Sequence, residues 1–164
     1  MIEELMRTWH DPHARHAALV HLPITLGVLG LAPLIWFAWT GFSQRVPRVI
    51  CLAWFMLAAV GAFVASQAGE AAEPLLASSR VPMTPTEAAA VHDHEEWGET
   101  AWLWPLGCSA LVAITHIPRR SARLVAGSLA IAVGAGSAAS IAYTAHLGGR
   151  LVYIHGLGVP ERLP

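Results

Sequence analysis

Histidine offers the most chemistry in this chain, because imidazole binds transition metals and haem iron and exchanges protons near neutral pH. The 164-residue sequence contains nine histidines. Eight belong to segments that we expect at one end of the molecule: His10, His13, His16, His21, His92, His94, His146 and His155. Only His116 belongs to the opposite end. Because segments that are distant in the sequence bring imidazoles to the same depth, we expect a shared binding site.

Four of these histidines are the strongest candidates for such a site: His21, His94, His146 and His155. His21 lies inside the first apolar segment and His146 ends the last one, and an ionisable residue within a membrane span is a functional candidate by default. His16 precedes His21 by five residues, or about 140° around a helix. The two cannot share one small ion without distortion, so they either serve two sites, or one is a ligand and the other a residue that supports it. We expect His10, His13 and His92 at the surface.

Three interpretations of this set remain open. Haem b is bound by two neutral imidazoles from different helices, and Arg150, close to His146, could pair with its propionates. Copper or zinc would use three or four ligands, with carboxylates in support, and the acidic segment around His92 and His94 is of that type. The third interpretation is that these histidines lie at a membrane interface and bind no cofactor.

The elements that position these side chains are predicted to be membrane helices. Charged residues make up 13% of the chain and hydrophobic residues 55%, whereas roughly 25% of a soluble domain is charged. The stretches without Asp, Glu, Lys or Arg are 16–44, 49–69, 100–118 and 124–149. A helix needs about 20 residues to cross a bilayer. We therefore predict one all-α domain, an integral membrane four-helix bundle with helices near 14–40, 47–68, 98–117 and 122–146.

Local signals refine these helices. Asp11 and Pro12 have the residue types of a helix start. Three prolines inside the spans should each bend a helix, because each removes a backbone hydrogen bond: Pro23, Pro33 and Pro105. Small residues in the last span would let a helix or a flat cofactor approach closely. Gly148 and Gly149 are expected to end that helix, and within the C-terminal return segment 147–164 residues 150–159 are expected to fold back over the histidines.

Charge predicts the orientation. Arginines flank the short connections near residues 45 and 119, which places both connections in the cytoplasm by the positive-inside rule. Both termini and residues 69–97 are then on the outer, periplasmic side of a bacterial inner membrane. Residues 69–97 are predicted to form an acidic loop, which is either simply solvated or a docking surface for a basic partner such as a soluble cytochrome. Thr84 or Thr86 is expected to cap a short helix within it.

The two ends of the sequence resemble one known family. The segment His16-Ala-Ala-Leu-Val-His21-Leu-Pro23-Ile24 resembles the H-x4-H-F-P-I start of the DUF2231 family of bacterial membrane proteins. The segment from His146 to Val159, H-L-G-G-R-L-V-Y-I-H-G-L-G-V, resembles the H-x-G-G-x-L-V-Y-x-H-G-V-G-V ending of that family. The chain departs from the family pattern at Leu22, at Leu157 and in residues 67–73, where the family tends to have a Gly-x-x-Asp turn.

The resemblance covers nearly the whole chain and implies a four-helix membrane domain. The family is sometimes found with cytochrome c-type domains, which implies a role in respiratory electron transfer. The histidines that match the family motifs are His16, His21, His94, His146 and His155.

The sequence thus predicts a haem b-binding membrane subunit that passes electrons between a quinol, or a partner cytochrome, and the outer face. It would belong to a larger redox complex in the lipid bilayer. The expected cofactor-binding residues are His16, His21, His94, His146, His155 and Arg150. A copper or zinc site at His21, His94, His146 and His155 is one alternative, and a cofactor-free anchor subunit is another. No nucleophile motif indicates a stand-alone enzyme, and a net charge of −1 gives no argument for nucleic acid.

Overall fold

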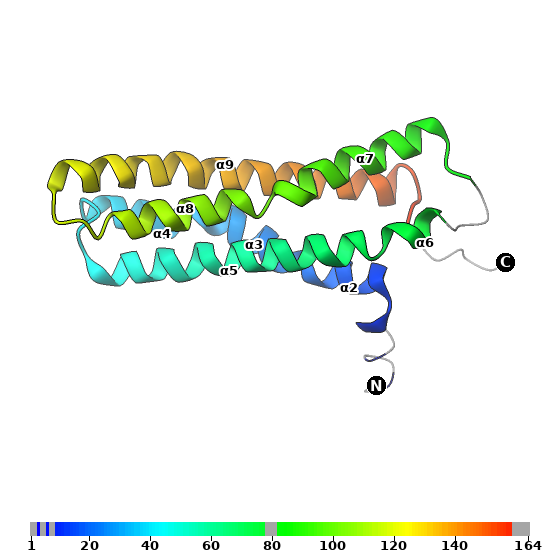
Figure 1. Cartoon of the computed structure of the whole chain (residues 1–164), viewed down its shortest axis with the longest axis horizontal. Coiled ribbons are helices and arrows are strands. Elements are labelled where there is room, and N and C mark those ends of the chain that lie inside the picture. The colour runs from blue at the N-terminus through cyan, green and yellow to red at the C-terminus, as the bar shows by residue number, and fades with distance from the viewer. Residues whose placement is uncertain (1–2, 4–5, 7–8, 78–81, 159–164) are drawn as a thin grey trace.

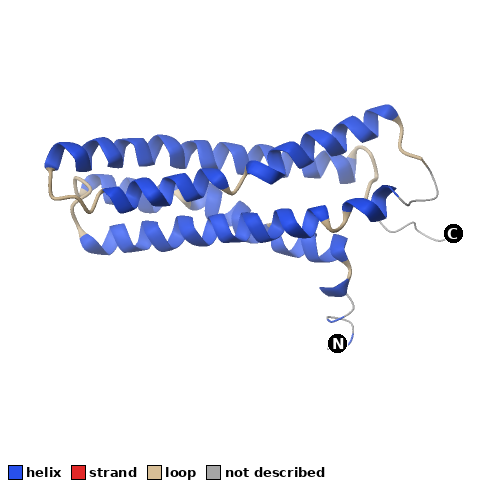
Figure 2. Ribbon diagram, in the orientation of Figure 1, coloured by secondary structure: helices blue, strands red, loops and turns tan. Residues whose placement is uncertain are grey.

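The computed structural model describes residues 3, 6, 9–77 and 82–158, and over this part the chain forms an all-α bundle. Four helical rods run alternately up and down, side by side (Figures 1 and 2). The first rod consists of α2 (Pro12–Leu19), α3 (His21–Leu29) and α4 (Leu31–Trp39). The second rod is α5 (Arg45–Glu70), which is followed by the short α6 (Glu73–Ala77). The third rod consists of α7 (Pro85–Thr100) and α8 (Leu103–Ile114), and the fourth is α9 (Arg120–Tyr153). The predicted fold class, all-α, is confirmed.

Within the described residues, three helices are long and apolar enough to cross a membrane: Pro12–Trp39, Arg45–Leu75 and Arg120–Tyr153. The third rod differs from the predicted span 98–117, because α7 and α8 meet at a turn at Ala101 and Trp102. By itself α8 has 12 residues, fewer than the roughly 20 that a crossing requires. A fourth crossing would have to include part of α7.

Prolines account for the interruptions within the rods. The first rod breaks at Val20 and again at Gly30, and the third breaks at 101–102. Each break precedes a proline by three or four residues: Pro23, Pro33 and Pro105. A proline has no N–H to bond the carbonyl four residues earlier. The predicted disruption at each proline is confirmed.

Two helices begin at the caps that the sequence indicates. The carboxylate of Asp11 accepts a hydrogen bond from the N–H of His13 at 2.9 Å. Thr84 and Glu87 form a capping box: the N–H of Glu87 donates to Thr84 Oγ1 at 3.3 Å, and the N–H of Thr84 donates to Glu87 Oε2 at 2.7 Å. This box starts a 16-residue helix. Most of the described part of segment 69–97, which was expected to be a loop, is therefore helical.

The end of α9 also differs from the expectation. The helix continues through Gly148 and Gly149 to Tyr153. Glycines with positive φ follow further on, at Gly156 (67°) and Gly158 (74°), and they suit the left-handed backbone that ends a helix. The predicted return segment therefore starts later than expected, and its residues 159–164 lie outside the described part.

The two ends of the bundle differ in composition. At one end the connections 40–44 and 115–119 are short, and five arginines lie beside them: Arg45, Arg48, Arg119, Arg120 and Arg123. We call this the arginine end. The guanidinium of Arg48 donates to the carbonyls of Phe42 and Ser43 at 3.4 and 3.3 Å, and its Nη1 lies 3.1 Å from Nδ1 of His116. The histidine end is the opposite one, where α2 begins and α9 ends (Figure 1).

Large side chains and small ones alternate in the core. Leu34, Phe37, Phe55 and Val112 are fully buried, and small residues of α9 admit them. A Cβ at Gly134, for example, would lie 2.5 Å from Cδ1 of Leu34. This close packing is what the small residues of the last span predict. Large apolar side chains also cover the outer surface: Val28, Leu29, Val60, Val125 and Leu129. An apolar core beneath an apolar surface is typical of membrane helices.

Candidate cofactor site

Two histidine rings meet inside the histidine end. His16 lies on α2 and His94 on α7, and their ring centroids are 6.2 Å apart with the planes at 84°. The helix α2 packs on α5, whereas α7 packs on α9. The two imidazoles therefore approach each other from separate pairs of helices. We call these two residues the histidine pair.

Each ring of the histidine pair is oriented by a backbone carbonyl of the neighbouring helix. Nδ1 of His16 lies 2.8 Å from the carbonyl oxygen of Ala65, and Nδ1 of His94 lies 3.2 Å from that of Thr144. A carbonyl can only accept, so both Nδ1 atoms carry the hydrogen and donate it. In the neutral form of each ring the lone pair is then on Nε2. A metal-binding histidine commonly has this tautomer and this type of hydrogen bond.

A glycine lies against each ring. A Cβ at Gly69 would lie 3.1 Å from Cε1 of His16, and a Cβ at Gly148 would lie 3.0 Å from Cε1 of His94. Each glycine follows the carbonyl-bearing residue, Ala65 or Thr144, by one helical turn. The same unit of carbonyl, glycine and imidazole therefore occurs twice, once on α5 and once on α9.

The environment keeps His94 neutral. Burial lowers the pKa of His94, the charge of nearby His16 lowers it further, and the hydrogen bond with Thr144 acts in the opposite direction. The usual pKa of histidine is about 6.5. With its pKa below that value, His94 is unprotonated at neutral pH, which is the form that binds a metal.

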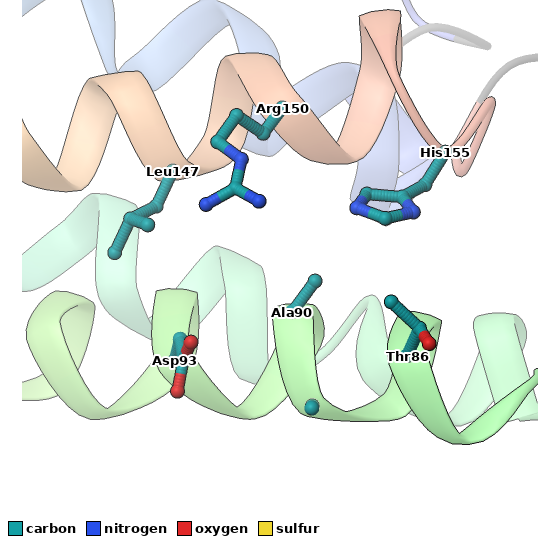
Figure 3. A pocket seen from close by; sticks show the side chains of 7 residues that line it. Thr86, Ala90, Asp93, Leu147, Arg150 and His155 are labelled. Carbon is teal, nitrogen blue, oxygen red and sulfur yellow. The ribbon is translucent and has the colours of Figure 1, made fainter.

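A small cavity of about 170 Å³ lies between α7 and the end of α9 (Figure 3). Arg150 projects into it from α9, and His155 projects into it from just beyond the end of that helix. Nε2 of His155 is buried without a hydrogen-bond partner. Asp93 and Leu147 also line the cavity, and they directly precede His94 and Gly148. The cavity therefore lies between the same two helices as His94 and Gly148.

The structure does not bring His21 and His146 to the histidine pair. Both are exposed, and Nδ1 of His21 donates to the carbonyl of Ala17 on its own rod at 2.8 Å. The expected convergence of His21, His94, His146 and His155 at one centre is therefore not found. Helical phase is the reason, because a step of five residues turns a side chain about 140° away from His16, and a step of two residues separates His146 from Gly148 by about 200°.

The local ligand cluster expected around His92 is not formed either. Within the described residues, no group of three or more His, Cys, Asp or Glu side chains is placed to hold a metal ion. His92 is exposed on α7. Glu95 is partly buried, and burial followed by the nearby charges of Glu73 and Glu99 raises its pKa. These carboxylates form an acidic surface where α6 faces α7.

Comparisons of the chain with protein-family models, with curated proteins and with solved structures found no match. The resemblance to the DUF2231 family therefore stays a prediction that rests on the motif residues.

Proposed function

We propose that this chain is a membrane protein that binds haem b between His16 and His94 and uses it to carry electrons. The arrangement of the histidine pair supports this most directly. Imidazole ligands have metal–nitrogen distances of about 2 Å, so two that bind one iron from opposite sides have ring centres about 6 Å apart. The observed separation is 6.2 Å, and both Nε2 atoms bear the lone pair.

The number of ligands favours haem over copper or zinc. A porphyrin supplies four nitrogens, so the protein has to supply only two axial ligands. A copper or zinc site takes three or four ligands from the protein, and the described part of the chain does not assemble them. Gly69 and Gly148 also fit the proposal, because they let both rings lie close to the helix backbones.

The adjoining cavity would serve the acidic edge of the cofactor. Haem carries two propionates, and Arg150 and His155 can each bond a carboxylate. The unpartnered Nε2 of His155 supports this assignment. When bound, haem supplies a one-electron couple at its iron. His16 and His94 would hold the group, Ala65 and Thr144 would orient the two rings, and Arg150 and His155 would neutralise the propionates.

In this proposal the three apolar helices cross the bacterial inner membrane, and α8 crosses with the end of α7. The positive-inside rule places the arginine end in the cytoplasm and the histidine end in the periplasm. The electron donor would be a membrane quinol or a basic cytochrome. A basic cytochrome would dock by charge complementarity on the acidic surface at Glu73, Glu95 and Glu99.

Absorption spectroscopy tests the proposal. The chain, purified from cells supplied with haem, should show a Soret band and a pyridine haemochrome of b type. His16→Ala and His94→Ala should each lose most of the band. His21→Ala and His146→Ala are the matched controls and should keep it, because both residues lie outside the pair. A colourless chain would contradict the proposal and favour a cofactor-free anchor subunit, and so would a His16→Ala variant with an unchanged spectrum.

A further inference from the structure

A second site lies near the arginine end, on the outer side of α8 and α9. A groove of about 440 Å³ runs between these helices. Its walls are apolar: Leu111 and Ile114 come from α8, and Val125 and Leu129 come from α9. Three of the four, Ile114, Val125 and Leu129, are 45 to 60% exposed. In the proposed orientation this groove opens to the hydrocarbon of the bilayer.

One end of the groove is cationic and polar. Arg119 and Ser121 line that end. Arg119 is also the N-cap of α9 and provides no side-chain cap for the helix. The first N–H groups of α9 therefore lack a side-chain acceptor and carry the partial positive charge of a helix start. Arg120 and Arg123 add two more cations within the same turn.

The shape of the groove matches an amphiphile. Leu129 follows Arg119 by ten residues, or about 15 Å along the helix, so the apolar walls descend from the cationic end. Small side chains leave room between them, since Ala122 and Ala126 also line the groove. An anion without a chain would leave these walls uncovered, and a neutral lipid would leave the cationic end unpaired.

We infer that this groove holds an anionic phospholipid from the bilayer. Its phosphate lies at Arg119, Ser121 and the first amides of α9, and one acyl chain lies between Ile114 and Leu129. This inference rests on the membrane insertion proposed above and not on haem binding.

Native mass spectrometry of the full chain in detergent tests the lipid site. Phosphatidylglycerol should bind more tightly than phosphatidylcholine with the same acyl chains. Arg119→Gln should weaken phosphatidylglycerol binding about fivefold, the effect of one cation near a lipid surface. Arg45→Gln is the matched control, because Arg45 is at the same end but does not line the groove, and it should change binding little. Ala122→Leu should fill the groove and weaken binding of both lipids.

Three results would overturn the inference. Equal binding of the two lipids would show that the groove does not distinguish lipids by the charge of the headgroup. Equal losses in Arg119→Gln and Arg45→Gln would show only a general attraction to the arginine end. Competition by glycerol phosphate as strong as that by the whole lipid would show an anion site without a chain. The Soret band should be the same in all these variants, so failure of the lipid site is separate from failure of haem binding.

Discussion

At the scale of single residues, each imidazole of the histidine pair makes two contacts with the neighbouring helix. Its Nδ1 bonds a backbone carbonyl, and its ring packs against a glycine. Glycine inside a helix costs about 1 kcal/mol relative to alanine. Gly69 and Gly148 therefore lower the stability of their helices. The close contact of each glycine with His16 or His94 explains why a glycine stands there. The neighbouring Gly149 has no such contact.

Alanine substitutions at the adjacent glycines should have opposite effects. Gly149→Ala should raise the free energy of unfolding by about 0.5–1 kcal/mol, because its Cβ meets open space within a helix. Gly148→Ala should lower it by about 1 kcal/mol, because His94 must shift and weaken its hydrogen bond to Thr144. Thermal unfolding of the purified chain measures both. Equal stabilisation by the two substitutions would contradict the role given to Gly148.

The stability of the bundle should fall between pH 7.5 and pH 5.5. The pKa of His94 is lower in the folded chain than in the unfolded chain, where it is about 6.5. The unfolded chain therefore binds more protons as the pH falls through 6.5, and acid favours unfolding. The melting temperature should drop across this window, and His94→Gln should reduce the drop. The capping Glu87, whose pKa is lowered below the usual carboxylate range, titrates at lower pH.

The sequence placed His94 among the four strongest candidates and left His16 as either a ligand or a residue that supports one, so it did not single out this pair. Residue types identify which side chains can bind a metal, whereas the phase of one helix against another decides which of them meet. His21 and His146 belong to the same motifs and point elsewhere. Gly69 and Gly148 carry no sequence signal of their own, because the contact of each glycine with a ring depends on which helix faces it.

At the scale of elements, backbone chemistry controls where the helices begin and break. Runs without charge predicted the three long apolar helices, and prolines predicted the breaks at Val20, Gly30 and residues 101–102. The sequence predicted only a short helix capped by Thr84 or Thr86, because the surface of α7 is polar, whereas the helix that this cap starts has 16 residues. The pair Gly148–Gly149 was misread because a glycine pair looks the same whether it ends a helix or admits a ring.

Removal of the cap should loosen the start of α7. Thr84→Ala deletes the hydroxyl that accepts from Glu87 N–H and should cost about 1 kcal/mol. Hydrogen exchange of the amides in the first two turns of α7 should speed up, while exchange in α5 stays unchanged. Thr86→Ala, two residues further on and outside the capping box, is the control. An equal effect of both substitutions would contradict the assignment of the cap.

At the scale of the whole molecule, charge and hydropathy give the bundle a direction. Large apolar side chains face outward along the rods, arginines surround one end, and histidines with carboxylates occupy the other. The sequence predicted this polarity because it depends on composition along the chain and not on contacts. The rotation of each rod about its own axis, which selects the histidine pair, depends on packing that the composition does not specify.

Thiol labelling tests the predicted orientation. The natural Cys51 and Cys108 are free but fully buried, so single introduced cysteines can be read against them. Ala88→Cys, exposed on α7, should react with a membrane-impermeant maleimide in intact spheroplasts. Ser43→Cys, exposed at the arginine end, should react only after the membrane is opened. The reverse pattern would place the histidine end in the cytoplasm.

The short connections 40–44 and 115–119 lie at the arginine end, so the chain itself holds the rods together there. No connection of that length joins the rods at the histidine end, where residues 71–84 make the link. Its closure depends instead on the histidine pair: His16 bonds α2 to α5, His94 bonds α7 to α9, and the two ring centroids are 6.2 Å apart. This end should therefore fray first. A ligand that bonded both Nε2 atoms would connect all four rods through two bonds. Binding of this ligand and closure of the bundle would then occur together.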